Sequence, residues 1–151
     1  MTIQKRTSKS LTHACHNHDA CLELDKLLEY NDWVITTAFY SALHYVDHSL
    51  FPDQFEIKGK ESRCTCFEEY ISKKSKGAFV SPHALRLDLV FLKLEDIGSS
   101  YKTLFDLCKT ARYKNFKMSI EDKNIALYEL KNIKEFCVEV DLEPLRVAPK
   151  E

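Results

Sequence analysis

Apolar residues recur at helical spacing along most of the chain, and the clearest case is the stretch 31–51. One side of a helix drawn through this stretch is apolar and consists of Ile35, Phe39, Ala42, Leu43, Val46 and Leu50. The opposite side carries aromatic and hydrogen-bonding groups, namely Trp33, Thr37, Tyr40, His44, Asp47 and His48. A solvent-facing side would carry Lys and Glu. The pattern therefore predicts a helix that is buried on both sides, with its polar stripe against a second subunit or a ligand.

Three further stretches have helical periodicity. The first covers residues 11–29, with Ala20, Leu24, Leu27 and Leu28 on its buried face, and Asn31 is expected to break this helix and cap the next. Another begins after Pro82 and runs to residue 113. The last begins at Ser119, where Ser119 and Asp122 resemble a capping box, and stops before Pro144.

Within the third helix, Gly98 is expected to mark a bend or a close approach of another helix, because glycine is unfavourable in a helix interior. Apolar spacing predicts the core positions of the third and fourth helices. These are Leu85, Leu89, Leu92, Tyr101, Leu104, Cys108, Ile125, Tyr128, Ile133, Phe136, Cys137 and Val140.

Residues 53–81 lack sustained periodicity and mix charges of both signs. They are predicted to form an irregular insertion that contains one short helix around Phe67–Lys74 and is otherwise mobile loop. The whole pattern predicts an all-α protein, an up-down four-helix bundle with this insertion between helices 2 and 3. Residues 1–151 are expected to form one domain, ordered over about 11–141, with a disordered tail at 142–151.

Composition narrows the function only slightly. The formal net charge of −1 leaves no overall attraction to nucleic acid, so any such attraction must be local. Neither a signal peptide nor a membrane span is evident, and we expect a soluble, cytoplasmic protein without a cofactor. The six cysteines are expected to be reduced thiols, with Cys108 and Cys137 acting as small apolar core residues.

A polar seam is the first candidate site, and its members are Tyr40, His44, Asp47, His48 and Arg86. Arg86 lies in an apolar helical stretch, where an arginine needs an acidic or phosphate partner. A salt bridge to Asp47 or Asp32 is favoured over a ligand phosphate. His44 and His48 lie one helical turn apart, which suits two ligands of one metal, but no third ligand follows. A hydrogen-bonded histidine pair is the favoured interpretation.

The segment HACHNHDAC is dense in soft metal ligands, with His13, Cys15, His16, His18 and Cys21, and Cys64 and Cys66 add two more thiols. Neither spacing is the usual Cys-x2-Cys pattern of zinc sites. A polar, partly frayed helix start is therefore favoured over a metal site.

A basic cluster is the second candidate site. Lys109, Arg112, Lys114 and Lys117 are interleaved with the aromatic residues Tyr113 and Phe116. Cations near a helix C-terminus are stabilised by the helix dipole without any partner. Basic groups beside exposed aromatic rings also bind phosphate and stack on unpaired bases. The sequence leaves both interpretations open.

Two helices share a pattern with a known superfamily. The matching positions are Asp32, Trp33, Ala38, Phe39, Tyr40, Ala42, His44, Val46 and Asp47 in the second helix, and Arg86, Tyr101, Leu104, Ala111, Arg112 and Tyr113 farther on. Over about residues 14–138 the chain resembles proteins of the HEPN superfamily. The resemblance implies a small helical bundle of the kind found in bacterial toxin–antitoxin, defence and nucleotide-transfer systems.

The chain departs from the ribonucleases of that superfamily. The resemblance implies an Arg followed after four to six residues by a His, which meet across a dimer as phosphate stabiliser and acid–base group. After Arg112 the chain reads YKNFKMS, and no histidine follows His83. The one pair at a similar spacing, Arg6 and His13, is expected to be a chance match in a mobile N-terminal segment. No catalytic residue is assigned.

These features together predict a non-catalytic, HEPN-like interaction module that associates with RNA or a nucleotide. A homodimer and a protein partner from an adjacent gene are expected, and a membrane is not. Two alternatives remain: a metal-independent ribonuclease that uses a histidine such as His44 in a non-standard arrangement, and a structural subunit that binds a protein.

Overall fold

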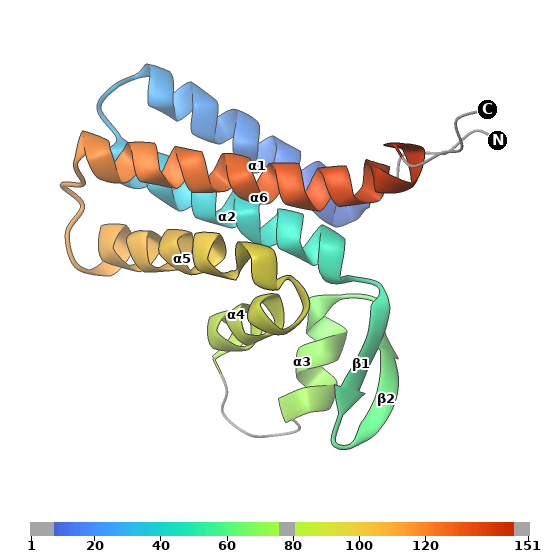
Figure 1. Ribbon diagram of the computed structural model, residues 1–151. Helices are drawn as coiled ribbons and strands as arrows, with labels where there is room; N and C mark the ends of the chain where they lie inside the picture. Colours follow the sequence, from blue (N-terminus) through green and yellow to red (C-terminus); the bar gives the residue numbers. More distant parts are fainter. Residues whose placement is uncertain (1–7, 76–80, 147–151) are drawn as a thin grey trace.

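The computed structural model describes residues 8–75 and 81–146, with side chains through residue 138. This part of the chain is mostly helical, as predicted, and includes one small two-stranded sheet (Figure 1). In chain order the elements are α1 (Lys9–Lys26), α2 (Asn31–Leu50), β1 (Asp53–Ile57), β2 (Lys60–Cys64), α3 (Phe67–Ser75), α4 (Pro82–Lys93), the 3₁₀ turn η1 (Glu95–Ile97), α5 (Gly98–Tyr113) and α6 (Ile120–Arg146).

Helix α2 is the centre of the fold, and α1, α5 and α6 pack against it (Figure 1). All six residues of its predicted apolar side are buried, so that prediction is confirmed. On the side toward α5, the Phe39 ring lies 5.6 Å from the Tyr101 ring and 5.8 Å from the Phe105 ring, measured between centroids. Such tilted aromatic pairs combine a large buried apolar area with favourable ring geometry.

The ends of α1 differ from the prediction. The helix begins at Lys9 because the Ser8 hydroxyl accepts a hydrogen bond from the Leu11 N–H (3.0 Å). It ends at Lys26, and Leu28 adopts the left-handed conformation (φ 59°). Leu27 and Leu28, which were expected in the core, are exposed because the chain has left the helix there.

Asn31 does not cap α2. It is the first residue of the helix, the N-cap position is Tyr30, and no side chain caps it. The Asn31 side-chain amide instead donates to the carbonyl of Met118 (3.1 Å) and so joins the α1–α2 connection to the segment before α6.

The predicted third helix is two helices separated by η1. Gly98 begins α5, and a Cβ atom at this position would lie 2.5 Å from the Phe91 ring of α4. Gly98 thus marks both a bend and a close approach. The buried face of α4 consists of Arg86, Leu89 and Val90. Leu92 lies about 110° around the helix from that face, so it is exposed rather than in the core.

Helix α6 begins as predicted, since Ser119 Oγ accepts the N–H of Asp122 (3.0 Å). It continues past Pro144 to Arg146, because a proline can kink a helix without ending it, at the cost of one hydrogen bond and a clash with the carbonyl four residues earlier. The predicted stop before Pro144 is therefore wrong. The disorder expected for the tail 142–151 stays a prediction. Residues 147–151 and the Val140 side chain lie outside what is described.

The core face of α6 is only partly as predicted. Its buried residues are Lys123, Ala126, Leu130, Ile133 and Cys137. Ile133 and Cys137 were expected there, and Phe136 and Leu85 of α4 are half-buried beside the core. Ile125 and Tyr128 are exposed, because both lie more than about 100° around the helix from this face.

Residues 53–64 form a β-hairpin, which corrects the expected irregular insertion. The strands are antiparallel, with Asp53 opposite Cys64 and Ile57 opposite Lys60. Lys58 and Gly59 both have positive φ, as a two-residue hairpin turn requires. Only Phe55 and Ile57 alternate into the core from β1, so the strand has too few apolar residues for its period to be recognised.

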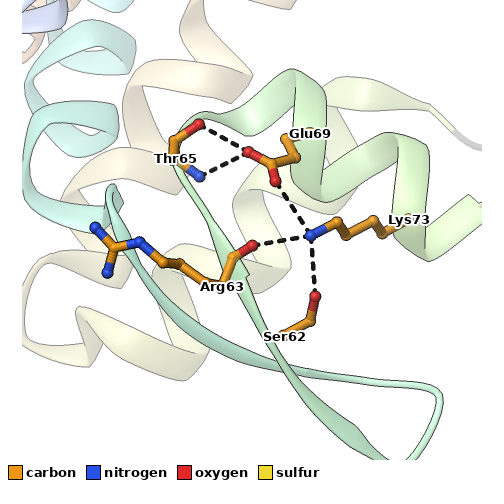
Figure 2. A network of polar contacts seen from close by, with 5 residues as sticks. All are labelled: Ser62, Arg63, Thr65, Glu69 and Lys73. Carbon is orange, nitrogen blue, oxygen red and sulfur yellow. Dashed lines mark hydrogen bonds and ion pairs between the residues drawn. The ribbon is translucent and has the colours of Figure 1, made fainter.

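Helix α3 occupies the predicted short helical segment and is joined to β2 by polar contacts. The Lys73 ammonium donates to Ser62 Oγ (3.0 Å) and to the Arg63 carbonyl (2.9 Å), and it pairs with Glu69 (3.1 Å) (Figure 2). Glu69 also accepts hydrogen bonds from the backbone N–H and the hydroxyl of Thr65. These contacts lower the pKa of Glu69 to about 2, and the bond from the Thr65 N–H has the largest effect. The hairpin and α3 are thereby held as one unit.

All six cysteines are free thiols, and Cys108 and Cys137 are buried, as predicted. Within residues 8–75 and 81–146, no helix is both long and apolar enough to cross a bilayer.

Candidate functional site

The predicted polar stripe of α2 divides into two parts. Asp47 and His48, near the C-terminal end of the helix, are buried inside the chain. Tyr40 and His44 are half-buried, and Trp33, near the N-terminal end, is 54% exposed. The expected seam is therefore not one continuous site.

The N-terminal part of the stripe lines a cleft of about 460 Å³ between α1, α2 and α5. Its lining residues are His13 and Asn17 of α1, Trp33, Thr36, Thr37, Tyr40 and His44 of α2, and Arg112 of α5. The steps of three and four residues on α2 place these side chains above one another along one wall. The cleft is open to solvent, and a volume of this size is within the usual range for small-molecule pockets.

Arg112 joins the two predicted sites. Its guanidinium donates to the Tyr40 hydroxyl (2.6 Å). The guanidinium carbon lies 5.8 Å from the centroid of the Tyr40 ring and 5.2 Å from that of the Tyr113 ring. Among the described residues, Tyr40 is the one hydrogen-bond acceptor of Arg112, so most of its five N–H groups remain for an anion.

Two histidines form part of the cleft wall. The His13 and His44 rings are stacked, with centroids 3.7 Å apart and an interplanar angle of 20°. Burial, and then the neighbouring His13 and Arg86, lower the pKa of His44 to about 4. His44 is therefore neutral at pH 7, with one ring nitrogen able to donate and the other able to accept.

The sequence interpretation missed the contribution of α1 to this site. His13 and Asn17 lie one turn apart and face the cleft together. His13 was grouped with possible zinc ligands, and the segment was expected to be frayed, whereas α1 is helical from Lys9. The four-residue spacing of His13 and Asn17 places both side chains on one face of a helix. Only the packing of α1 on α2 shows that this face lines the cleft.

Arg86 forms the predicted salt bridge with Asp47. Its Nε and Nη2 atoms donate to the two carboxylate oxygens at 2.9 and 3.1 Å, and both side chains are buried. The guanidinium carbon also lies 3.8 Å from the centroid of the Phe67 ring. Burial raises the pKa of Asp47, and Arg86 opposes that rise. The pair is satisfied within the chain.

In the described part of the chain, His44 and His48 have different contacts in place of the expected hydrogen-bonded pair. The His48 ring is buried, and its Nδ1 lies 2.7 Å from the Ser8 hydroxyl, while His44 stacks on His13. One helical turn along α2 thus separates a ring inside the core from a ring that lines the cleft.

The possible zinc ligands point in different directions. Cys21 is buried and donates to the Val34 carbonyl, and Cys15 and His18 lie beside the Tyr45 hydroxyl. On the hairpin side, Cys64 is buried and Cys66 is exposed. Within the described residues, no group of three or more His, Cys, Asp or Glu side chains is arranged to hold a metal ion. Arg6, the possible partner of His13, lies outside these residues.

The remaining basic and aromatic residues of the cluster are not among those that line the cleft. Lys109, Lys114 and Lys117 are exposed, and so are Tyr113 and Phe116. The Lys109 ammonium lies 5.1 Å from the centroid of the Phe105 ring. Tyr113, whose ring lies near the Arg112 guanidinium, connects this cluster to the cleft.

Comparison with known proteins gave no match to a protein-family model, to a curated protein or to a solved structure.

Proposed function

We propose that the chain is a cytoplasmic, HEPN-like module that binds RNA or a nucleotide in the cleft between α1, α2 and α5, without cleaving it. The observation that carries this proposal is the position of Arg112, whose guanidinium is anchored on Tyr40 at an opening that also presents Trp33. A fixed cation beside an exposed aromatic ring can bind a phosphate and a base at the same time.

The other cleft residues support a neutral, hydrogen-bonding ligand surface. Asn17, Thr36 and Thr37 supply amide and hydroxyl groups, and the neutral His44 ring supplies a donor and an acceptor. These groups suit the edge of a base or a ribose hydroxyl. With a net charge of −1 over the whole chain, the attraction to phosphate must come from Arg112 and the lysines near it.

The fold assignment is part of the proposal. In the expected four-helix bundle, α1, α2 and α6 would be the first, second and fourth helices, α4 and α5 together the third, and the hairpin and α3 the insertion after α2. A bacterial toxin–antitoxin or defence system, a homodimer and an adjacent-gene partner belong to the same proposal and follow from the resemblance.

Binding without catalysis is favoured over a ribonuclease. Acid–base cleavage of RNA needs one group that accepts a proton and another that donates one. His44 has a pKa of about 4, so at neutral pH it is not protonated and cannot serve as the acid. No histidine follows Arg112 at the superfamily's spacing.

A binding experiment can use the protein's own fluorescence, because Trp33 is the one tryptophan of the chain and lines the cleft. We expect an eight-nucleotide RNA to change the Trp33 emission and to raise the anisotropy of a fluorescein label, and added salt to weaken both effects. Arg112→Ala should lower the affinity about 10- to 100-fold, the range for a charged hydrogen-bonding group. Arg63→Ala, which removes an exposed arginine from the hairpin, is the matched control.

The same samples separate the alternatives. RNA cleavage that persists with a chelator and is lost in His44→Ala would support the ribonuclease. If RNA does not bind at any salt concentration, the alternative of a structural subunit that binds a protein is favoured. Equal losses in Arg112→Ala and Arg63→Ala would contradict the assignment of the cleft as the binding site.

A further inference from the structure

The Tyr113 ring lies next to the cleft but is not part of its lining. It is 73% exposed, and its ring centroid lies 5.2 Å from the Arg112 guanidinium carbon. The Arg112 guanidinium therefore has two aromatic rings within 6 Å, Tyr40 at 5.8 Å and Tyr113 at 5.2 Å. Of these two rings, only Tyr40 lines the cleft.

The segment after α5 extends this surface. Phe116 and Lys117 are exposed, and hydrogen bonds order the backbone around them. The Lys117 N–H donates to Asn115 Oδ1, the Met118 N–H donates to the Phe116 carbonyl, and the Asn31 side chain donates to the Met118 carbonyl. The α1–α2 and α5–α6 connections lie at the same end of the molecule (Figure 1). Beyond Arg112, the chain thus exposes Tyr113, Phe116 and Lys117 in succession.

We propose that the ligand is a single strand of RNA spanning at least two nucleotides, with one base against Trp33 in the cleft, the next base on Tyr113, and the phosphate between them on Arg112. This inference rests on the proposed function and specifies its ligand class. A mononucleotide would fill the cleft and leave Tyr113 unused. In a duplex the base faces are covered by their neighbours, so neither ring could stack on them.

Cations along the proposed path are available for further phosphates. In the part of the chain that the structure describes, Lys114 and Lys117 form no ion pair with a carboxylate, whereas Lys102 on the preceding turns of α5 is paired with Asp106 (2.7 Å). The unpaired lysines lie on the Tyr113 side of Arg112 in the sequence. Binding should therefore tighten as the strand lengthens beyond one nucleotide, and its salt dependence should become steeper.

The experiment compares three probes on the full chain: adenosine 5′-monophosphate, a labelled single-stranded RNA of eight nucleotides, and the same RNA in a duplex with its complement. Tyr113→Ala should weaken binding of the single strand about 5- to 100-fold, the range for loss of one base–aromatic stack, and leave binding of the mononucleotide unchanged. Tyr128→Ala removes another exposed tyrosine, from α6, and should change neither. The duplex should bind at least tenfold more weakly than the single strand.

The possible failures are distinguishable. If the mononucleotide binds and depends on Arg112, but the single strand binds no better or ignores Tyr113→Ala, this inference is overturned and the proposed function survives. A duplex that binds as well as the single strand also overturns it. If neither nucleotide nor RNA changes the Trp33 emission or the anisotropy, both proposals fail. Circular dichroism of each variant verifies that the helices are intact.

Discussion

Neighbouring side chains on one face of α2 have different surroundings, and this determines their chemistry. His44 and His48 are separated by one helical turn, yet His48 is enclosed by the core while His44 stacks on His13 at the cleft. Tyr40 is held by the guanidinium of Arg112, which comes from a distant part of the chain. Each residue type was visible in the sequence, but its role depends on which helix packs beside it.

The pH dependence of stability tests the surroundings of His44. The pKa of His44 is lowered from 6.5 to about 4 in the folded chain. Between these two pH values the histidine is therefore protonated in the unfolded chain and neutral in the folded chain. The free energy of unfolding should therefore be greatest above pH 6.5 and fall as the pH decreases toward 4. A shift of this size corresponds to about 3 kcal/mol for an enclosed group, and because the ring is half-buried we expect about 1–2 kcal/mol.

Urea unfolding followed by circular dichroism at pH 7 and pH 5 measures this effect. His18 and His83 also have lowered pKa values, so part of the decrease remains without His44. His44→Gln should reduce the difference between the two pH values, whereas His16→Gln, which changes an exposed ring on α1, should not. An unchanged difference in His44→Gln would show that the ring is not desolvated.

Some helix ends could be predicted from local sequence and others could not. Ser119 caps α6 as its sequence motif predicts, because a serine hydroxyl three residues before a free N–H is a local interaction. The end of α1 was not predictable in this way. Leu28 has a left-handed backbone, a conformation that favours glycine, and its side chain is 77% exposed.

Replacing Leu28 with glycine should therefore stabilise the protein. The position follows the C-cap of α1, where glycine is the usual residue because it has no Cβ to clash in this conformation. We expect Leu28→Gly to raise the free energy of unfolding by roughly 0.5–1 kcal/mol. Leu27→Gly, at a neighbouring residue with φ −77°, should lower it by a similar amount. If both variants lose stability in urea unfolding, Leu28 is not strained.

At the scale of the whole molecule, Arg86 connects the inserted segment to the helical body. It lies on α4, pairs with Asp47 of α2 and covers the Phe67 ring of α3. Three elements, α2, α3 and α4, thus meet at one buried guanidinium. The hairpin is attached to the same group through α3, by the contacts of Lys73.

Arg86→Met should destabilise the protein by about 3–5 kcal/mol, because it leaves the Asp47 carboxylate buried without its partner. The double variant Asp47→Leu with Arg86→Met removes both charges and should cost much less than the sum of the two single changes. Urea unfolding of the four proteins gives the coupling energy. Additive losses would contradict a buried, coupled pair.

The sequence alone predicted a good part of this molecule. The apolar face of α2, the helical character, the salt bridge of Arg86 and the reduced cysteines follow from local periodicity and from the cost of burying a charge. The hairpin was not predicted, because only Phe55 and Ile57 show the two-residue alternation of apolar positions that indicates a strand. The core faces of α4 and α6 were misjudged at Leu92, Ile125 and Tyr128, since several faces of each helix are apolar enough to be buried.

For the candidate site, the sequence by itself indicated several residues of α2 and α5 but not their association, and it missed the contribution of α1. It marked Tyr40 and His44 as polar groups on a buried helix and Arg112 as part of a basic, aromatic cluster, because spacing along one helix is a local property. Only the tertiary structure decided that Arg112 meets Tyr40, that His13 comes from α1 to stack on His44, and that Asp47 and His48 are enclosed. These contacts join residues up to 72 positions apart. They depend on how the helices pack against one another, which no local pattern contains.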